Sequence, residues 1–413
     1  MDNATVPPGW RTFTLDELFE FSNGVNADKS AYGEGIPFVN VLDVISNEAL
    51  TGPDIPGRIR LSPSLTARYQ VRYGDVLLNR TSETQDEVGL TSVYLGDFSV
   101  LFGGFVFRAR PRTNHLDVGY SKYALRASYV REQIIACGQG GIRANVGQRD
   151  LKKVRVSLPV PEEQRLIAQA LRDIDDQVEA LERMLAKKQA IKQGIMQHLL
   201  TDKSGSERSL ASGGDAALGA IATWFSGGTP DRNNPAYWGG TIPWISAATL
   251  KQSHVYESDQ HLTDSGVRAG SKIAPAGAIL VLVRGMALHR ETRIGVTTRP
   301  VSFNQDVKAL IPKPGVIPDY LLYALQARSS QLLDLVSSAG SGTGVLNTQL
   351  LQRLPIWVPE ETVQVRIVGA IDAADREVGL FRERLAKTHA VKLGMMQQLL
   401  TGRTRLPDEE RES

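Results

Sequence analysis

Short apolar runs bounded by Gly, Pro, Asn and Asp recur in two regions of the chain, residues 1–159 and 218–358. Such runs predict β-strands, and apolar residues spaced by three and four predict a helix. The predicted strands are Ile36–Val41, Asp75–Leu78, Thr91–Leu95, Phe105–Ala109 and Val154–Leu158, then Ile242–Ile245, Ala278–Val283, Ile294–Thr298, Val307–Ile311 and Leu354–Val358. The predicted helices are Tyr120–Ala136 and Pro318–Val336. We therefore expect two domains of the α/β (α+β) class.

Each region is followed by a longer segment with a heptad repeat. Pro161 and the two acidic residues after it are typical of a helix start. The heptad positions are Ile167, Ile174, Leu181, Ile195 with Leu171, Val178, Leu185, Leu199, and Ile367, Ala374, Phe381, Met395 with Ile371, Val378, Leu385, Leu399. The first seam is interrupted at Lys188 and Lys192, and the second at Thr388 and Lys392. A helix of about 40 residues spans about 60 Å, so each needs a partner helix, and we expect the two to pair as an antiparallel coiled coil.

A shift of 200 residues superimposes the chain on itself. Gln164–Thr201 matches Gln364–Thr401, and the Tyr120 and Tyr123 pair recurs as Tyr320 and Tyr323. Two copies whose helices pair antiparallel are related by a pseudo-two-fold axis, with one domain at each end of the pair. The expected order is a first domain (1–159), a first spacer helix (160–201), a Ser/Gly-rich flexible linker (202–217), a second domain (218–358), a second spacer helix (359–402) and a charged, disordered tail (403–413).

Composition narrows the class of protein. The 47 basic and 45 acidic residues give a net charge of +2, which by itself indicates neither nucleic acid nor membrane as a partner. The longest apolar run, Ile273–Val283, is too short to cross a membrane, and Met1–Trp10 lacks the layout of a signal peptide. A single cysteine, Cys137, excludes a disulfide framework and a cysteine zinc cluster. We expect a cytoplasmic protein with no membrane partner and no metal site.

Motifs of catalysis are missing from the sequence. It has no phosphate-binding loop and no nucleophile elbow, and its six histidines are scattered. Asn234-Pro235-Ala236-Tyr237 is similar to the base-holding loop of amino-group DNA methyltransferases, but it lacks the second proline, and a cofactor-binding loop is absent. We therefore favour a turn at this position over a methyltransferase site and predict no catalytic residue.

The candidate binding residues lie in two pairs of polar loops at similar points of the repeat. One pair follows the predicted strands Asp75–Leu78 and Ala278–Val283, and the other pair is rich in glycine, which lets the backbone approach a phosphate. Arginine outnumbers lysine by 33 to 14, a bias that suits bidentate contacts with guanine and phosphate. Solvated loops are the alternative interpretation. The predicted DNA-binding residues are Arg80, Thr81, Ser82, Thr84, Gln85, Arg143, Asn145, Arg284, His289, Arg290, Arg293, Thr343 and Asn347.

The whole arrangement resembles the specificity subunit of type I restriction-modification enzymes. The similarity rests on Pro159-Val-Pro-Glu-Glu-Gln164-Arg-Leu-Ile167, the Gly-x-Met-Gln-x-Leu-Leu-Thr helix end and their duplication, together with Gly227-Gly-Thr-Pro230 and Gly74-Asp75-Val-Leu-Leu. The second copy departs from this pattern at Glu360-Glu361-Thr-Val-Gln364.

This resemblance implies a prokaryotic protein with two target-recognition domains separated by two spacer helices, and with no catalysis of its own. It implies that the chain recognises an asymmetric bipartite site in double-stranded DNA. It further implies two methyltransferase subunits and motor-nuclease subunits as partners, with S-adenosylmethionine, ATP and Mg²⁺ on those partners. The alternative is a coiled-coil adaptor that binds proteins without reading DNA, in which we would expect apolar patches instead of Arg-bearing loops.

Overall fold

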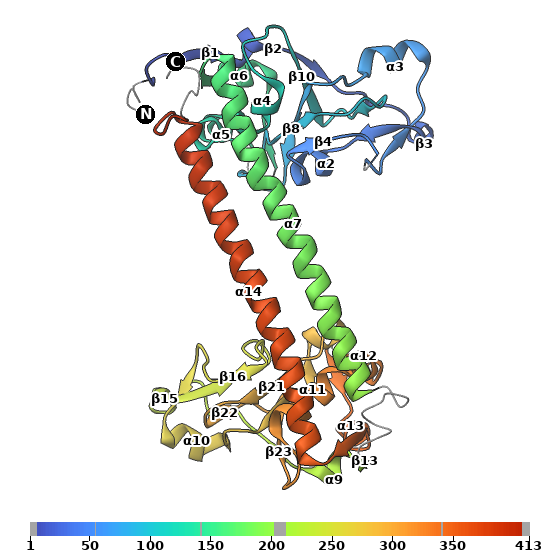
Figure 1. Cartoon of the computed structure of the whole chain (residues 1–413), viewed down its shortest axis with the longest axis vertical. Helices are drawn as coiled ribbons and strands as arrows, with labels where there is room; N and C mark the ends of the chain where they lie inside the picture. The colour runs from blue at the N-terminus through green and yellow to red at the C-terminus, as the bar shows by residue number, and fades with distance from the viewer. Residues whose placement is uncertain (1–5, 54, 141–142, 202–211, 340–341, 407–413) are drawn as a thin grey trace. The chain divides into compact units, whose positions relative to one another are not determined.

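The chain forms two compact units, each containing one domain and half of each long helix. The computed structural model describes residues 6–53, 55–140, 143–201, 212–339 and 342–406 (Figure 1). Unit 1 comprises Met1–Leu181 and Arg384–Ser413, and unit 2 comprises Glu182–Glu383. A division into separate domains and separate helices therefore does not match the packing, because each helix contributes to both cores.

Unit 1 is built on a five-stranded sheet with the order β2-β10-β6-β8-β4. All its neighbouring strands are antiparallel except β4 and β8, which run parallel. Smaller ladders join β1 to β12, β7 to β11, and β5, β3 and β9. The strands are β1 (Arg11–Thr14), β2 (Phe19–Asn23), β3 (Tyr32–Val39), β4 (Ala49–Leu50), β5 (Arg58–Ile59), β6 (Val76–Asn79), β7 (Thr81–Ser82), β8 (Thr91–Tyr94), β9 (Leu101–Phe102), β10 (Val106–Pro111), β11 (Ala144–Asn145) and β12 (Arg155–Leu158). The helices of its domain are α1 (Leu15–Leu18), α2 (Val41–Ser46), α3 (Pro63–Tyr69), α4 (Val118–Ala124), α5 (Ser128–Ala136) and α6 (Gln148–Leu151).

Unit 2 repeats this topology. Its five-stranded sheet has the order β14-β23-β19-β21-β16, again with one parallel pair at the β16 edge. The strands are β13 (Gly213–Ala217), β14 (Ala222–Ser226), β15 (Trp238–Ile245), β16 (His254–Val255), β17 (His261–Leu262), β18 (Ile273–Ala274), β19 (Ile279–Leu282), β20 (Arg284–Gly285), β21 (Ile294–Thr297), β22 (Val301–Phe303), β23 (Val307–Pro312), β24 (Val336–Ser338), β25 (Gly344–Leu346) and β26 (Pro355–Pro359). The helices of its domain are α9 (Leu218–Ile221), α10 (Asp264–Gly270), α11 (Pro318–Gln326), α12 (Ser329–Asp334) and α13 (Thr348–Gln352). The matching strand orders confirm the duplication and the mixed α/β class, and a strand lies within or overlaps every predicted run.

The two predicted domain helices are wrong as single helices, because each is split in two. In unit 1 the break falls at Ala127, whose backbone is extended (φ −56°, ψ 141°). The guanidinium of Arg126 donates to the carbonyl of Thr91 at 2.8 Å and so holds the break against the sheet. In unit 2 the break falls at Arg328, whose guanidinium donates to the carbonyls of Ala324 and Leu200. Local periodicity gave no sign of these breaks because the acceptors on Thr91 and Leu200 are distant in sequence.

The long helices are α7 (Pro161–Leu200) and α14 (Glu361–Leu399), and α7 starts at the predicted proline. In unit 2 the two helices are joined by ion pairs of Lys188 with Glu377 and of Lys192 with Asp375. The residue number rises along α7 while it falls along α14. The helix segments of unit 2 are therefore antiparallel, as predicted. The lysines that interrupt the first heptad seam form ion pairs with the facing helix, and this explains the interruption.

Apolar positions of the helices enter the domain cores. Ile167 and Leu171 are buried in unit 1 in one cluster with Leu399, and Ile367 and Ile371 are buried in unit 2 together with Met196. Burying a side chain of this size contributes about 1.5–3 kcal/mol. Each domain therefore stabilises the helix ends that it contacts.

A buried glutamine joins each helix start to its domain. The side chain of Gln164 donates to the carbonyls of His115 and Pro159 at 2.7 and 2.9 Å and accepts from the Asp117 amide at 2.8 Å. Its counterpart Gln364 makes the same three kinds of bond in unit 2. The Pro-Glu-Glu-Gln segment thus positions the start of the helix. The sequence before Gln364 differs, but the hydrogen bonds of the glutamine are the same in kind.

The predicted linker and tail need correction. Residues 202–211 and 407–413 lie outside the described residues, but Gly213–Ala217, predicted as linker, is strand β13 and pairs with β26 along its whole length. Of the predicted tail, Arg405 forms an ion pair with Glu163 at the start of α7, within unit 1. Neither segment has an apolar pattern, so the sequence did not indicate this pairing.

Within the described part of the chain, no helix is long and apolar enough to cross a membrane.

Candidate nucleic-acid interface

In unit 1 the two predicted loops lie side by side. The residues after β6 form β7, which pairs with β11 of the Gly-rich loop, with Ser82 opposite Ala144 and Thr81 opposite Asn145. The amide of Val146 donates to the carbonyl of Arg80 at 3.0 Å and extends the ladder. Two segments far apart in sequence are thereby brought to one end of the central sheet.

Unit 2 brings its two loops together in the same way. Strand β20 after β19 pairs with β25, with Arg284 opposite Val345 and Gly285 opposite Gly344. The amide of Leu346 donates to the carbonyl of Val283 at 2.9 Å. The imidazole Nε2 of His289 lies 2.8 Å from the carbonyl oxygen of Gly342 and adds a further contact between the loops.

The two ladders show that Arg80 and Arg284 do not occupy equivalent positions. Arg80 corresponds to Val283, because their carbonyls accept from the amides of Val146 and Leu346. The next residues in the two ladders, Thr81 and Arg284, correspond in the same way. The two arginines are therefore offset by one position. The loops match in polarity but not in sequence, so the sequence does not determine their register.

Several predicted residues expose their side chains at this end of each unit. Arg80, Thr84, Gln85, Arg143 and Asn145 are exposed in unit 1, as are Arg284, His289 and Arg290 in unit 2, whereas Thr81 and Thr343 are half-buried. The guanidinium of Arg80 lies 5.7 Å from the centre of the Phe107 ring, a stacked position that leaves its donors at the surface.

Other predicted residues are engaged within the protein. The hydroxyl of Ser82 donates to Glu87 at 2.8 Å, and the carbonyl oxygen of the Asn347 side chain accepts from Gln349 and Leu350 as the N-cap of α13. These side chains shape the loops, and their contact with DNA stays a prediction.

Arg293 is engaged in the same way in unit 2. Its guanidinium pairs with Glu291 and donates to the carbonyl of Ala247 at 2.6 Å. It thereby joins the loop after β20 to the loop after β15.

A cavity of about 760 Å³ lies beside the loop of unit 2. Its wall includes Ala247 and Ala248 from the loop after β15, and Met286, His289 and Arg290 from the predicted loop. The cavity therefore combines apolar side chains with a guanidinium and an imidazole. This combination suits a ligand that is anionic but also has an apolar edge.

A buried arginine holds the loop of unit 1 in place. Arg131 of α5 donates from one guanidinium nitrogen to the carbonyls of Asp86 and Val88, both at 2.8 Å. Burial lowers the pKa of Arg131 to about 10, so the side chain is still cationic at neutral pH. The sequence did not indicate this role, because an arginine within a helix gives no sign of which loop it supports.

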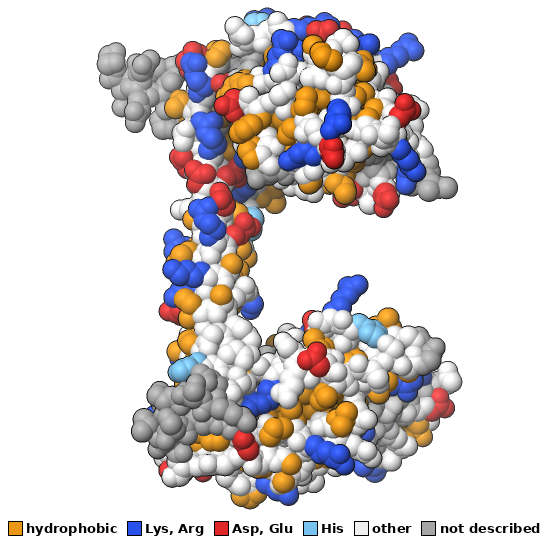
Figure 2. All heavy atoms as spheres, turned by 90° about the vertical axis from the view of Figure 1, so that its right-hand side faces the viewer, with side chains coloured by type: hydrophobic (Ala, Val, Ile, Leu, Met, Phe, Trp, Pro, Cys, Tyr) orange, Lys and Arg blue, Asp and Glu red, His pale blue; other side chains and the backbone are white. Residues whose placement is uncertain are grey.

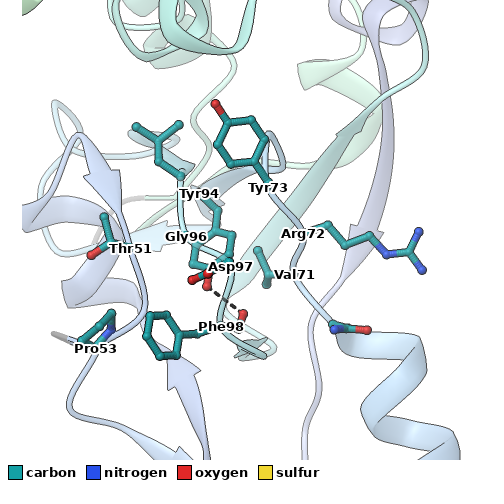
Figure 3. Close-up of a pocket in the computed structure, with 11 residues that line it drawn as sticks. Thr51, Pro53, Val71, Arg72, Tyr73, Tyr94, Gly96, Asp97 and Phe98 are labelled. Carbon is teal, nitrogen blue, oxygen red and sulfur yellow. Dashed lines mark hydrogen bonds between the residues drawn. The ribbon is translucent and has the colours of Figure 1, made fainter.

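A second cavity, of about 710 Å³, lies at the other end of the unit 1 sheet (Figure 3). Tyr73 precedes β6 and Phe98 follows β8, so both lie at the end opposite to the loop at Arg80. Gly52 (φ +112°) allows the close packing here, because a Cβ at this position would lie 2.9 Å from that of Phe98. The aromatic side chains of Tyr73 and Phe98 at this cavity are exposed, which is typical of a surface that contacts another protein.

Charged side chains of both signs are mixed on one face of the molecule. On the face seen in Figure 2, Lys and Arg side chains are scattered among acidic and apolar ones. Among the described residues, no group of three or more His, Cys, Asp or Glu side chains could hold a metal ion.

Comparison with known proteins identifies the family. The family described as "Type I restriction modification DNA specificity domain" matches residues 7–193 and again residues 215–387. The chain belongs to this family. The two matches correspond to the two copies of the repeat. Each match includes one domain and more than half of the long helix that follows it, α7 or α14.

Individual relatives agree with this assignment. The chain is 30% identical over 172 residues to the type I restriction enzyme EcoR124I/EcoR124II specificity subunit of Escherichia coli. The matched residues cover 41% of this chain and 43% of that protein. It is 29% identical over 164 residues to the MjaIX specificity subunit of Methanocaldococcus jannaschii, covering 38% of this chain and 36% of that one. The chain therefore matches less than half the length of these curated relatives.

Solved structures share the fold of the specificity domains and the helices between them. The type I restriction-modification S subunit of M. genitalium covers 99% of this chain and 98% of its own length at a TM-score of 0.56 and 17% identity. A chain from a study of the assembly and conformational transition of the type I system covers 97% of this chain and 100% of its own length, at a TM-score of 0.65 and 18% identity. At these identities the similarity establishes the fold alone.

Proposed function

We propose that the chain is the DNA sequence-specificity subunit of a type I restriction-modification system and that it reads an asymmetric bipartite site, one half with each unit. The observation that carries this proposal is the pair of loops at the end of the sheet in each unit. Both pairs expose arginines that can bind base edges and phosphates. The two loop pairs share a backbone ladder and differ in side chains, which is what two unequal half-sites require.

The proposal assigns catalysis to other chains. Two methyltransferase subunits and motor-nuclease subunits would carry S-adenosylmethionine, ATP and Mg²⁺, and this chain would supply sequence recognition and a scaffold. The near-neutral charge of +2 fits this division, since partners would contribute much of the unspecific phosphate binding.

Exposed apolar side chains support the docking of protein partners. Tyr73 and Phe98 border the unit 1 cavity, away from the loop at Arg80. Leu380, Val391 and Leu393 of α14 are also exposed, although they lie on a helix with buried heptad positions. The same observation favours the second candidate function, a protein-binding adaptor that does not read DNA.

Selection from a random double-stranded DNA library separates the two candidates. We expect the full chain, in complex with its methyltransferase subunits, to enrich a sequence split into two short halves by an unspecified spacer. An adaptor would enrich no sequence, and a result of that kind would overturn the proposal.

A further inference from the structure

One loop position has different side-chain chemistry in the two units. The backbone ladders make Thr81 equivalent to Arg284, so the position two residues later is Glu83 in unit 1 and Met286 in unit 2. Both follow the last residue of the short strand, β7 or β20, that places the loop at the end of the sheet.

Both side chains are directed to the surface. The carboxylate of Glu83 is 87% exposed, and it lies 4.0 Å from the guanidinium of Arg143, which is itself exposed. Met286 is 66% exposed and lines the 760 Å³ cavity with Ala248 and Arg290. Neither side chain contributes to a core, so packing does not dictate its identity.

The chemistry of the two side chains matches different base edges of the major groove. A carboxylate accepts a hydrogen bond from the exocyclic amino group of cytosine, and an apolar side chain contacts the methyl group of thymine. A carboxylate also repels phosphate, so it disfavours any arrangement in which it does not find an amino group.

We infer that this position selects one base pair in each half-site, with Glu83 reading a cytosine amino group and Met286 a thymine methyl group. The inference rests on the proposed function and names the bases that two of its contacts would read. Arg80 and Arg284, which lie close by in sequence, would supply the neighbouring contacts that hold the loops in the groove.

Exchange of the two side chains tests the inference. DNA selection with the full chain and its methyltransferase subunits should give Glu83→Met a changed preference at one base pair of one half-site, from C·G to T·A. Met286→Glu should change one base pair of the other half-site in the opposite sense. Tyr256→Glu is a matched control, because Tyr256 is exposed in unit 2 but follows β16 at the opposite end of the sheet, and we expect it to leave the selected sequence unchanged.

A second measurement needs no variant. Replacing thymine by uracil in the selected site removes only the methyl group, and loss of a contact to one such group weakens binding about fourfold. We expect this loss at one thymine of the half-site that Met286→Glu alters, and none when the DNA is bound by Met286→Ala. If a split sequence is selected but neither the exchange nor uracil changes it, the inference is overturned and the proposed function stands. If no split sequence is selected, both fall.

Discussion

The ammonium group of Lys392 on α14 lies 2.8 Å from the carboxylate of Asp175 on α7. The same pair recurs 200 residues away, where Lys192 lies 2.5 Å from Asp375. In unit 1 the pair is part of a larger cluster, since Lys122 and Glu48 join it. The duplicated helices therefore make equivalent contacts, and in unit 1 two charged residues of the domain, Lys122 and Glu48, join them.

Asp175→Asn should destabilise unit 1 by about 3 kcal/mol, because it leaves two largely buried lysines with only Glu48 to balance them. Asp375→Asn is the matched control: Asp375 is 36% exposed against 19% for Asp175, so we expect a loss of no more than about 1 kcal/mol in unit 2. Hydrogen–deuterium exchange of the full chain measures each unit separately. Equal losses in the two units would contradict the account.

The same cluster predicts sensitivity to acid. Burial favours a higher pKa for Asp175, but hydrogen bonds from Lys122, Lys392 and Tyr123 outweigh it and lower the pKa below the ordinary value. A carboxyl group with a lowered pKa stabilises the folded state at pH values above its pKa in the unfolded chain, about 3.9. This stabilisation is lost as the pH falls through the pKa of the folded state. Unit 1 should therefore lose more stability below about pH 4 in the parent chain than in Asp175→Asn, as followed by urea unfolding at several pH values. Parallel pH profiles would show that Asp175 does not contribute.

Gln164→Leu should destabilise the start of α7 by at least about 2 kcal/mol. The change leaves two carbonyls and one amide without partners in a buried site, and each such group costs about 1–3 kcal/mol. Gln169→Leu is the control, because Gln169 is exposed on the same helix and should change stability by less than about 0.5 kcal/mol. A loss below about 1 kcal/mol for Gln164→Leu would mean that water replaces the amide.

Arg131→Met should loosen the loop of unit 1 without changing unit 2. The variant removes two hydrogen bonds from a charged donor to Asp86 and Val88, each worth about 1.5–3 kcal/mol. We expect faster hydrogen exchange in residues 80–90 and weaker binding of one half-site only. Unchanged exchange in this segment would show that the loop is held by its ladder with β11 alone.

The sequence predicted the features that depend on local pattern. The strands, the start of α7 at Pro161 and the duplication were visible in periodicity and self-similarity. The pairing of each loop with its Gly-rich partner, the lock at Gln164 and the anchor at Arg131 depend on acceptors distant in the chain. No local pattern encodes such acceptors, so these contacts required the structure, as did the one-residue offset between Arg80 and Arg284.

The central claim is that each unit reads its own half of one DNA site, and paired arginine variants test it most directly. In DNA selection with the full chain and its methyltransferase subunits, Arg80→Ala should relax one half of the site and Arg284→Ala the other. Each should weaken binding to the parent site by about 1–3 kcal/mol. Arg72→Ala and Arg299→Ala, at the opposite ends of the two sheets, should leave both halves unchanged. If both loop variants relax the same half, or neither relaxes any, the account of two independent reading units is contradicted.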